Sequence, residues 1–174
     1  MTKLRKQKQD PRLRQTAVSG SAFININFFT MITTGLFTSK TDMWATPQDF
    51  FDKLNKVHNF DLDVCAIPEN AKCDKYFTPE IDGLKQDWHG SVFMNPPYGR
   101  EISKWVEKAY SESRKGNCKV VALLPARTDT KWFHDNIYMH YSVSVDLIKG
   151  RLKFGDSKNS APFPSMVVVF EAVR

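Results

Sequence analysis

The tetrapeptide Asn95-Pro96-Pro97-Tyr98 is the part of this sequence best suited to chemistry. The Asn95 side-chain carbonyl accepts hydrogen bonds. The Pro96 backbone carbonyl is a second acceptor, held in place by the fixed φ of proline. Two acceptors on one exocyclic amine draw its nitrogen toward a tetrahedral, nucleophilic geometry. Tyr98 offers an aromatic face for a base turned out of a duplex. The tetrapeptide therefore predicts methylation of an amine on a planar ring, although Asn and Pro are also ordinary loop residues.

Strands and helices alternate around this loop. Helices are predicted at 47–57, 101–115 and 130–139, and strands at 60–64, 75–78, 91–94, 120–124, 143–148 and 165–170. This order predicts an α/β fold with a mostly parallel sheet and a C-terminal antiparallel hairpin. Ligands of such sheets lie at the carboxyl ends of the strands, where Asp63 and Asn95 fall.

The start of the first helix is marked by Thr46-Pro47. We expect Thr46 to be the N-cap and Pro47 to take the first helical position, with Asp49 in the first turn.

Positive charge is unevenly distributed along the 174 residues. The net charge is +6, and the first 20 residues contain six basic residues against one acidic residue, which gives +5. We interpret 1–20 as a basic flexible tail, which either is simply solvated or attracts phosphates, and 21–41 as an apolar N-terminal extension. The domain proper is expected at 42–174.

Metal and membrane readings are not favoured. The three cysteines are irregularly spaced and the four histidines show no ligand spacing, so we expect no metal site. Residues 17–37 are too interrupted by polar side chains for a transmembrane helix. We expect a soluble, cytoplasmic protein.

An ordered series of motifs resembles the phage-type DNA N-6-adenine methyltransferase family, the small Dam-like enzymes. The series covers roughly 42–170 and comprises 42–47 (Asp-Met-Trp-Ala-Thr-Pro), 60–66, 82–84, Asp87-Trp88, 95–99, 105–109, 124–133, 150–154 and 160–166. The first 40 residues are not covered.

The resemblance implies a Rossmann-like methyltransferase fold, S-adenosylmethionine as cofactor, and methylation of adenine N6 in DNA. The cofactor-binding residues that it implies are Trp44, Thr46, Pro47, Asp63, Cys65, Ala66, Asp82 and Asn95. Trp44 would pack on the cofactor, Thr46 and the helix start would hold its carboxylate, and Asp63 would pair with its ammonium. Asp82 would accept from its adenine amine or ribose. Asp63 and Asp82 could instead be ordinary turn carboxylates, and no Gly-x-Gly loop follows Asp63.

Basic side chains after the predicted strand ends are candidates for phosphate contact, with plain solvated charges as the alternative. The set is Arg100, Arg127, Arg151 and Lys158, together with Lys149 and Lys153, and Tyr98 is the candidate contact to the base. No separate segment for reading DNA sequence is visible. Residues 21–40, 66–90 and 149–165 are the candidates for that role.

Two other functions remain open at this stage. One is methylation of another planar amine or amide, in an RNA base or a protein glutamine. The other is a catalytically silent nucleic-acid-binding protein, which the basic tail and the 13% aromatic content would suit.

Overall fold

The elements that position the tetrapeptide are seen in a computed structural model that describes residues 44–173. In chain order they are α2 (Gln48–His58), β1 (Leu62–Asp63), the 3-10 helix η1 (Gly83–Lys85), β2 (Gly90–Met94), α3 (Ile102–Arg114), β3 (Cys118–Pro125), α4 (Lys131–Asn136), β4 (Val143–Leu147) and β5 (Ser165–Phe170). The tail 1–20 and the extension 21–41 lie outside the described residues.

The five strands form one mixed sheet in the order β1-β2-β3-β5-β4. β1, β2 and β3 run parallel, whereas β5 runs antiparallel to both β3 and β4. The α/β class is therefore confirmed. The parallel pairings are confined to the first three strands, because β5 returns between β3 and β4 instead of adding to the parallel edge.

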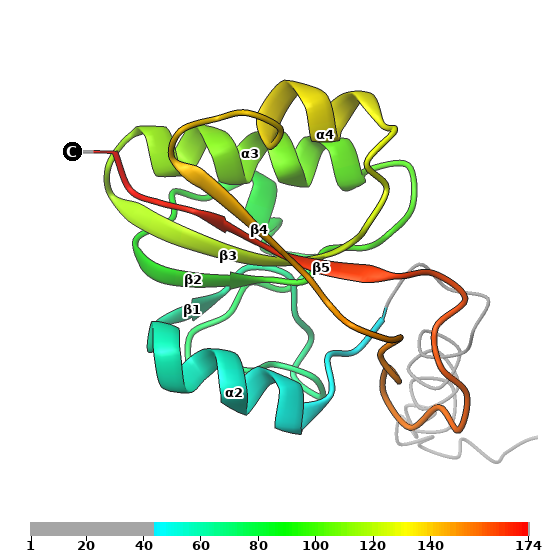
Figure 1. The fold of residues 1–174 in the computed structure, drawn as a ribbon. Helices are drawn as coiled ribbons and strands as arrows, with labels where there is room; N and C mark the ends of the chain where they lie inside the picture. Colours follow the sequence, from blue (N-terminus) through cyan, green and yellow to red (C-terminus); the bar gives the residue numbers. More distant parts are fainter. Residues whose placement is uncertain (1–43, 174) are drawn as a thin grey trace, which may run out of the picture.

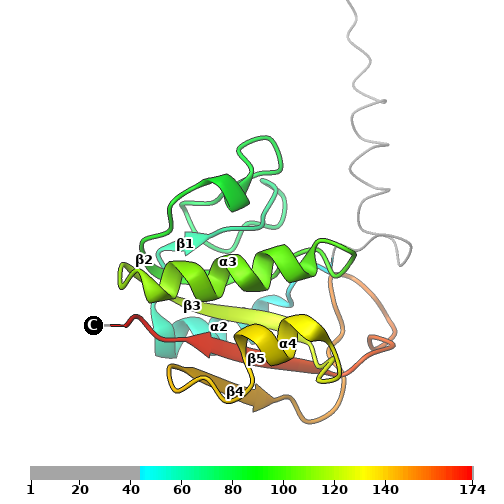
Figure 2. The same cartoon turned by 90° about the horizontal axis from the view of Figure 1, so that it is seen from above.

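Helices cover both faces of the sheet, with α3 and α4 on one side and α2 on the other (Figure 1). Seen from above, α3 runs along the sheet with α4 beside it (Figure 2). Coverage on both sides explains why β3 and β5 are continuous apolar runs rather than alternating ones. Every residue of β5 is buried, and so is Phe93 of β2, whose ring packs 5.1 Å from that of Phe51 on α2.

The first helix begins one residue later than expected. Pro47, not Thr46, occupies the N-cap position of α2, and no side chain caps the helix there. The Pro47 carbonyl accepts from the Phe51 N–H at 3.0 Å. The prediction of Thr46 as N-cap is thus wrong, because the Thr46 hydroxyl oxygen is engaged by Asn95 instead.

Two elements are shorter than their sequence patterns suggested. The expected strand 75–78 is reduced to one bridge between Asp63 and Tyr76. The expected helix 130–139 ends at Asn136. Tyr138 and Met139 beyond it are exposed, and Met139 has a φ of 63°, so neither burial nor backbone conformation supports a further turn.

The ends of β1, β2 and β3 and the loop 148–164 lie at one end of the sheet. The carboxyl ends of β1, β2 and β3 meet there because these strands are parallel, and the loop 148–164 reaches the same end because β5 begins there. This loop contacts the segment before α2, since the Gly155 N–H donates to the Ala45 carbonyl at 2.8 Å. Within residues 44–173, no helix has the length and apolar character needed to cross a bilayer.

Candidate active site

A narrow hollow lies where β1 and β2 end beside the segment that leads into α2. It is lined by Trp44, Ala45, Thr46, Asp63, Cys65, Asn70, Lys72, Phe93 and Asn95. Five of the residues expected to bind the cofactor are thus brought together: Trp44, Thr46, Asp63, Cys65 and Asn95. The hollow has a volume of about 20 Å³, roughly that of one water site.

Asn95 is held by its amide nitrogen. Nδ2 donates to the Trp44 carbonyl and, at 2.9 Å, to the Thr46 hydroxyl oxygen. The Asn95 carbonyl oxygen, Oδ1, is buried and has no hydrogen-bond partner. Such an atom is costly in a folded protein, because its hydration is lost and nothing replaces it. Asn95 therefore presents an unpaired acceptor.

The two prolines extend this acceptor site. Pro96 is buried and Pro97 is half-buried. In the part of the chain that is described, the Pro96 carbonyl accepts no hydrogen bond. The backbone thus leaves a second acceptor next in the chain to Asn95.

Tyr98 lies deeper than expected from the sequence. Its side chain is only 4% exposed, and its hydroxyl donates to the Leu123 carbonyl at 3.1 Å. Burial raises the pKa of the phenol well above its usual value, so the hydroxyl stays protonated. The rings of Phe154 and Phe163, both from the loop 148–164, pack edge-on against Tyr98 with centroids 6.1 and 5.5 Å away. Stacking of Tyr98 on a base stays a prediction that requires this loop to move.

Trp44 belongs to the same aromatic cluster. Its ring packs edge-on against Phe163 at 5.0 Å and against Phe154 at 5.5 Å. The cluster of Trp44, Tyr98, Phe154 and Phe163 therefore joins the hollow to the C-terminal loop.

Asp63 is the only carboxylate among the residues that line the hollow. It is 3% exposed, and its oxygens accept from the backbone N–H groups of Cys65 at 3.2 Å and Lys72 at 3.1 Å. Burial raises the pKa of Asp63 to about 6, against the opposing effect of these N–H groups and of the Lys72 ammonium. Asp63 is thus suited to a cationic ligand group, which would lower its pKa again.

Sequence reasoning missed Asn70, Lys72 and Phe93 as lining residues. The Asn70 side chain accepts from the Ile67 N–H at 2.8 Å, which closes a turn over 67–70. Lys72 donates its ammonium to the Gln48 side chain at 2.8 Å. No periodic pattern marks 66–74, since this segment has no helix or strand, so only the tertiary structure places Lys72 over Asp63.

The remaining expected cofactor residues, Pro47, Ala66 and Asp82, are not among those that line the hollow. Asp82 has a φ of 57°, accepts from the Leu84 N–H and pairs with Lys85 at 2.9 Å, so it acts as the cap of η1. Ala66 is buried and donates its N–H to the Phe77 carbonyl. Pro47 takes the N-cap position of α2. Among the described residues, the polar contacts of the Asp82 side chain are with Leu84 and Lys85.

The basic candidates are exposed at the carboxyl end of the parallel strands. Arg100 follows the tetrapeptide, Arg127 follows β3, and Arg151 and Lys158 lie in the loop 148–164. Arg151 donates to the Ala161 carbonyl at 3.3 Å, which ties it to its own loop.

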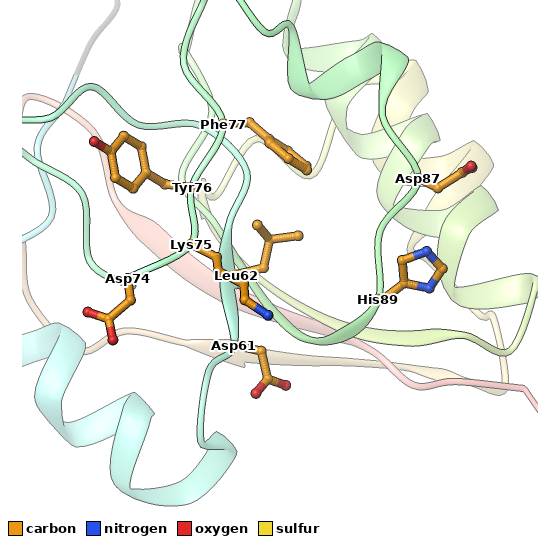
Figure 3. A pocket seen from close by; sticks show the side chains of 8 residues that line it. All are labelled: Asp61, Leu62, Asp74, Lys75, Tyr76, Phe77, Asp87 and His89. Atoms are coloured by element: carbon orange, nitrogen blue, oxygen red, sulfur yellow. The ribbon is translucent and has the colours of Figure 1, made fainter.

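A larger cavity, of about 470 Å³, lies elsewhere and is drawn in Figure 3. Its lining residues are Asp61, Leu62, Asp74, Lys75, Tyr76, Phe77, Asp87 and His89. Asp61 precedes β1 and His89 precedes β2, so the cavity lies toward the amino ends of these strands, away from Asn95. Among residues 44–173, no cluster of three or more His, Cys, Asp or Glu side chains could hold a metal ion.

Comparison with known proteins identifies a family and two phage relatives. A family model described as DNA N-6-adenine-methyltransferase (Dam) matches residues 33–174. The DNA N-6-adenine-methyltransferase of Haemophilus phage HP1 (strain HP1c1) is 36% identical over 141 residues, which cover 76% of this chain and 80% of that protein. The protein of the same name from Escherichia phage T1 is 36% identical over 95 residues, covering 53% of this chain and 39% of that protein.

The fold has a counterpart among solved structures. A "putative RNA methyltransferase" from Pyrococcus horikoshii superposes with a TM-score of 0.50 at 13% identity, covering 75% of this chain and 87% of that one. At this identity the likeness concerns the fold alone.

Proposed function

The chain belongs to the DNA N-6-adenine-methyltransferase (Dam) family, and from that membership we propose that it transfers the methyl group of S-adenosylmethionine to the N6 amine of an adenine turned out of DNA. The observation that carries the proposal is the buried, unpaired Oδ1 of Asn95. An acceptor kept without a partner is what an incoming amine N–H requires.

The residues of the tetrapeptide supply two acceptors for one amine. The lone pair of adenine N6 is delocalised into the ring, so the free amine is a poor nucleophile. Asn95 Oδ1 accepts one N–H and the Pro96 carbonyl accepts the other, which favours the tetrahedral geometry in which the lone pair is available. Positioning rather than acid–base chemistry then accounts for most of the rate.

The residues of the hollow fit the amino-acid end of the cofactor. When bound, S-adenosylmethionine supplies a methyl group made electrophilic by its sulfonium charge. The buried Asp63 carboxylate would pair with the ammonium of the ligand, and it lines the same hollow as Asn95. The hollow is too small for the whole cofactor, so residues that line it would have to move apart on binding.

The target base would enter on the side of the aromatic cluster. Phe154 and Phe163 cover Tyr98, so displacement of the loop 148–164 is the step that uncovers a stacking face. Arg127 and Arg151 are exposed at the same end of the sheet, where they can contact phosphates without reading sequence.

The decisive experiment follows transfer of labelled methyl from S-adenosylmethionine to duplex DNA that lacks N6-methyladenine. We expect N6-methyladenine in the digested product, and a rate about a hundredfold lower for Asn95→Ala, since one transition-state hydrogen bond is removed. Asn117→Ala, an exposed amide at the other end of β3, is the matched control. N4-methylcytosine as sole product would overturn the base assignment.

Two further substrates test the alternatives in the same assay. Methyl transfer to RNA or to a protein glutamine, with none to DNA, would replace the proposed substrate. DNA binding without any S-adenosylmethionine binding by calorimetry would identify a silent nucleic-acid-binding protein instead.

A further inference from the structure

We propose that Thr46 is a positioning residue whose hydroxyl oxygen fixes the Asn95 amide, so that Oδ1 faces the target amine. The inference rests on the proposed function and adds to it a residue outside the tetrapeptide. Thr46 lies 49 residues before Asn95 in the chain and meets it only through the fold.

The direction of the Asn95 amide follows from its two partners. The Trp44 carbonyl can only accept, so the group that faces it must be Nδ2 rather than Oδ1. The second N–H of Nδ2 goes to the Thr46 hydroxyl oxygen at 2.9 Å. Both N–H groups of the amide are then used, and Oδ1 is left on the opposite side, buried and unpaired.

The Thr46 hydroxyl has no competing structural task among the described residues. It stands directly before α2 but does not cap the helix, since α2 has no side-chain cap. The side chain is nevertheless only 5% exposed. The one hydrogen bond of this buried hydroxyl is the one that it accepts from Asn95. We therefore explain the hydroxyl by the orientation that it gives to the Asn95 amide.

Loss of this bond should slow the reaction, and the Nδ2 N–H left without an acceptor should also lower the free energy of unfolding. With the Trp44 carbonyl as sole partner, the amide keeps one hydrogen bond and can rotate about it. Rotation moves Oδ1 away from the position in which it faces the target amine. Preorganised groups contribute to rate because they need no rearrangement as the transition state forms. The inference therefore predicts a slower methyl-transfer step that no change in cofactor affinity accounts for.

The first test compares Thr46→Val, which is isosteric but lacks the acceptor, with Thr46→Ser, which keeps it. Single-turnover methyl transfer should be about tenfold slower in the valine variant, equivalent to about 1.4 kcal/mol, and the serine variant should restore most of that loss. Calorimetry measures S-adenosylmethionine affinity in the same variants, because Thr46 also lines the hollow proposed for the cofactor, and the fall in single-turnover rate should exceed any fall in affinity. A valine variant that loses affinity but keeps its single-turnover rate would place Thr46 in cofactor binding and overturn the proposal.

A double-mutant cycle then asks whether Thr46 acts through Asn95. In the Asn95→Ala background the amide is absent, so Thr46→Val should change the rate by less than about twofold. An equal loss in both backgrounds would show that Thr46 acts independently, and the inference would be wrong.

A readout free of catalysis keeps this inference separate from the proposed function. The Asn95 side-chain NH₂ gives a pair of signals in a ¹⁵N–¹H correlation spectrum, assigned by their disappearance in Asn95→Ala. Thr46→Val should shift one proton of the pair, whereas Thr46→Ser should leave both near their wild-type positions. Unchanged signals in the valine variant refute the hydrogen bond. If the signal shifts but the protein methylates no DNA, the Thr46–Asn95 hydrogen bond is supported and the proposed reaction is wrong.

Discussion

Cofactor affinity should depend on pH through Asp63, because this carboxylate is buried beside the site proposed for the ammonium of the ligand. Burial raises its pKa from 3.8 to about 6. Only the ionised form attracts a cation. About a tenth of the carboxylate is ionised at pH 5 and about nine tenths at pH 7, so the affinity for S-adenosylmethionine should rise about tenfold between these values.

The titration of Cys65 does not explain a change in cofactor affinity between pH 5 and 7. Burial raises the pKa of the Cys65 thiol well above its ordinary value, so Cys65 stays neutral. Burial lowers the pKa of Lys72, with Asp63 acting against that change. Any contribution from Lys72 would persist in Asp63→Asn, so that variant separates it from the contribution of Asp63.

The assay is isothermal titration calorimetry with S-adenosylmethionine at pH 5, 6 and 7. Asp63→Asn should bind about 10- to 100-fold more weakly at pH 7, because a hydrogen bond to a charged group is lost, and should show no rise with pH. Asp74→Asn, an exposed carboxylate, is the matched control and should keep the wild-type slope. Equal wild-type affinity at pH 5 and 7, or a rise that persists in Asp63→Asn, would refute the reasoning.

The same residue should give folding stability an unusual pH dependence. The pKa of Asp63 is higher in the folded state than in the unfolded state, so the folded chain binds the additional proton between about pH 4 and 6. Its contribution to the free energy of unfolding therefore falls as the pH rises through that window. A shift of about two units corresponds to about 3 kcal/mol. Urea unfolding should show that Asp63→Asn loses less stability than wild type between pH 4 and 7.

Three further outcomes are expected. Addition of S-adenosylmethionine should change the tryptophan fluorescence, and Trp44→Phe should abolish the change. Trp44 lines the hollow, whereas the other tryptophans are buried in the core, namely Trp88, Trp105 and Trp132. A fluorescence change that persists in Trp44→Phe would place the ligand elsewhere. Arg127→Ala should reduce the slope of log K for DNA against log salt by about 0.9, while Lys53→Ala on α2 leaves it unchanged; an unaltered slope in Arg127→Ala would remove it from the interface. Phe154→Ala should lower the free energy of unfolding in urea by about 3 kcal/mol, since its ring is only 4% exposed; a loss below about 1 kcal/mol would mean that the loop contributes little packing.

Local pattern in the sequence was sufficient for the elements that carry the site. The apolar run before Asn95 and the alternation that ends at Asp63 predict strands, and parallel strands bring their carboxyl ends to one edge. For this reason Asp63 and Asn95 were expected at one site, and both line the hollow. Strand and helix periodicity is a property of neighbouring residues, so it can be read without knowledge of the packing.

Contacts between distant segments were decided only by the tertiary structure. Thr46-Pro47 reads locally as a helix cap, yet the Thr46 hydroxyl oxygen accepts from Asn95, 49 residues away. Tyr98 reads as an exposed loop aromatic, yet two phenylalanines of the loop 148–164 cover it. The unpaired Oδ1 of Asn95 and the raised pKa of Asp63 also depend on burial by segments far apart in the chain. Residue type shows which atoms can donate or accept, but their partners and their exposure to water are set by packing.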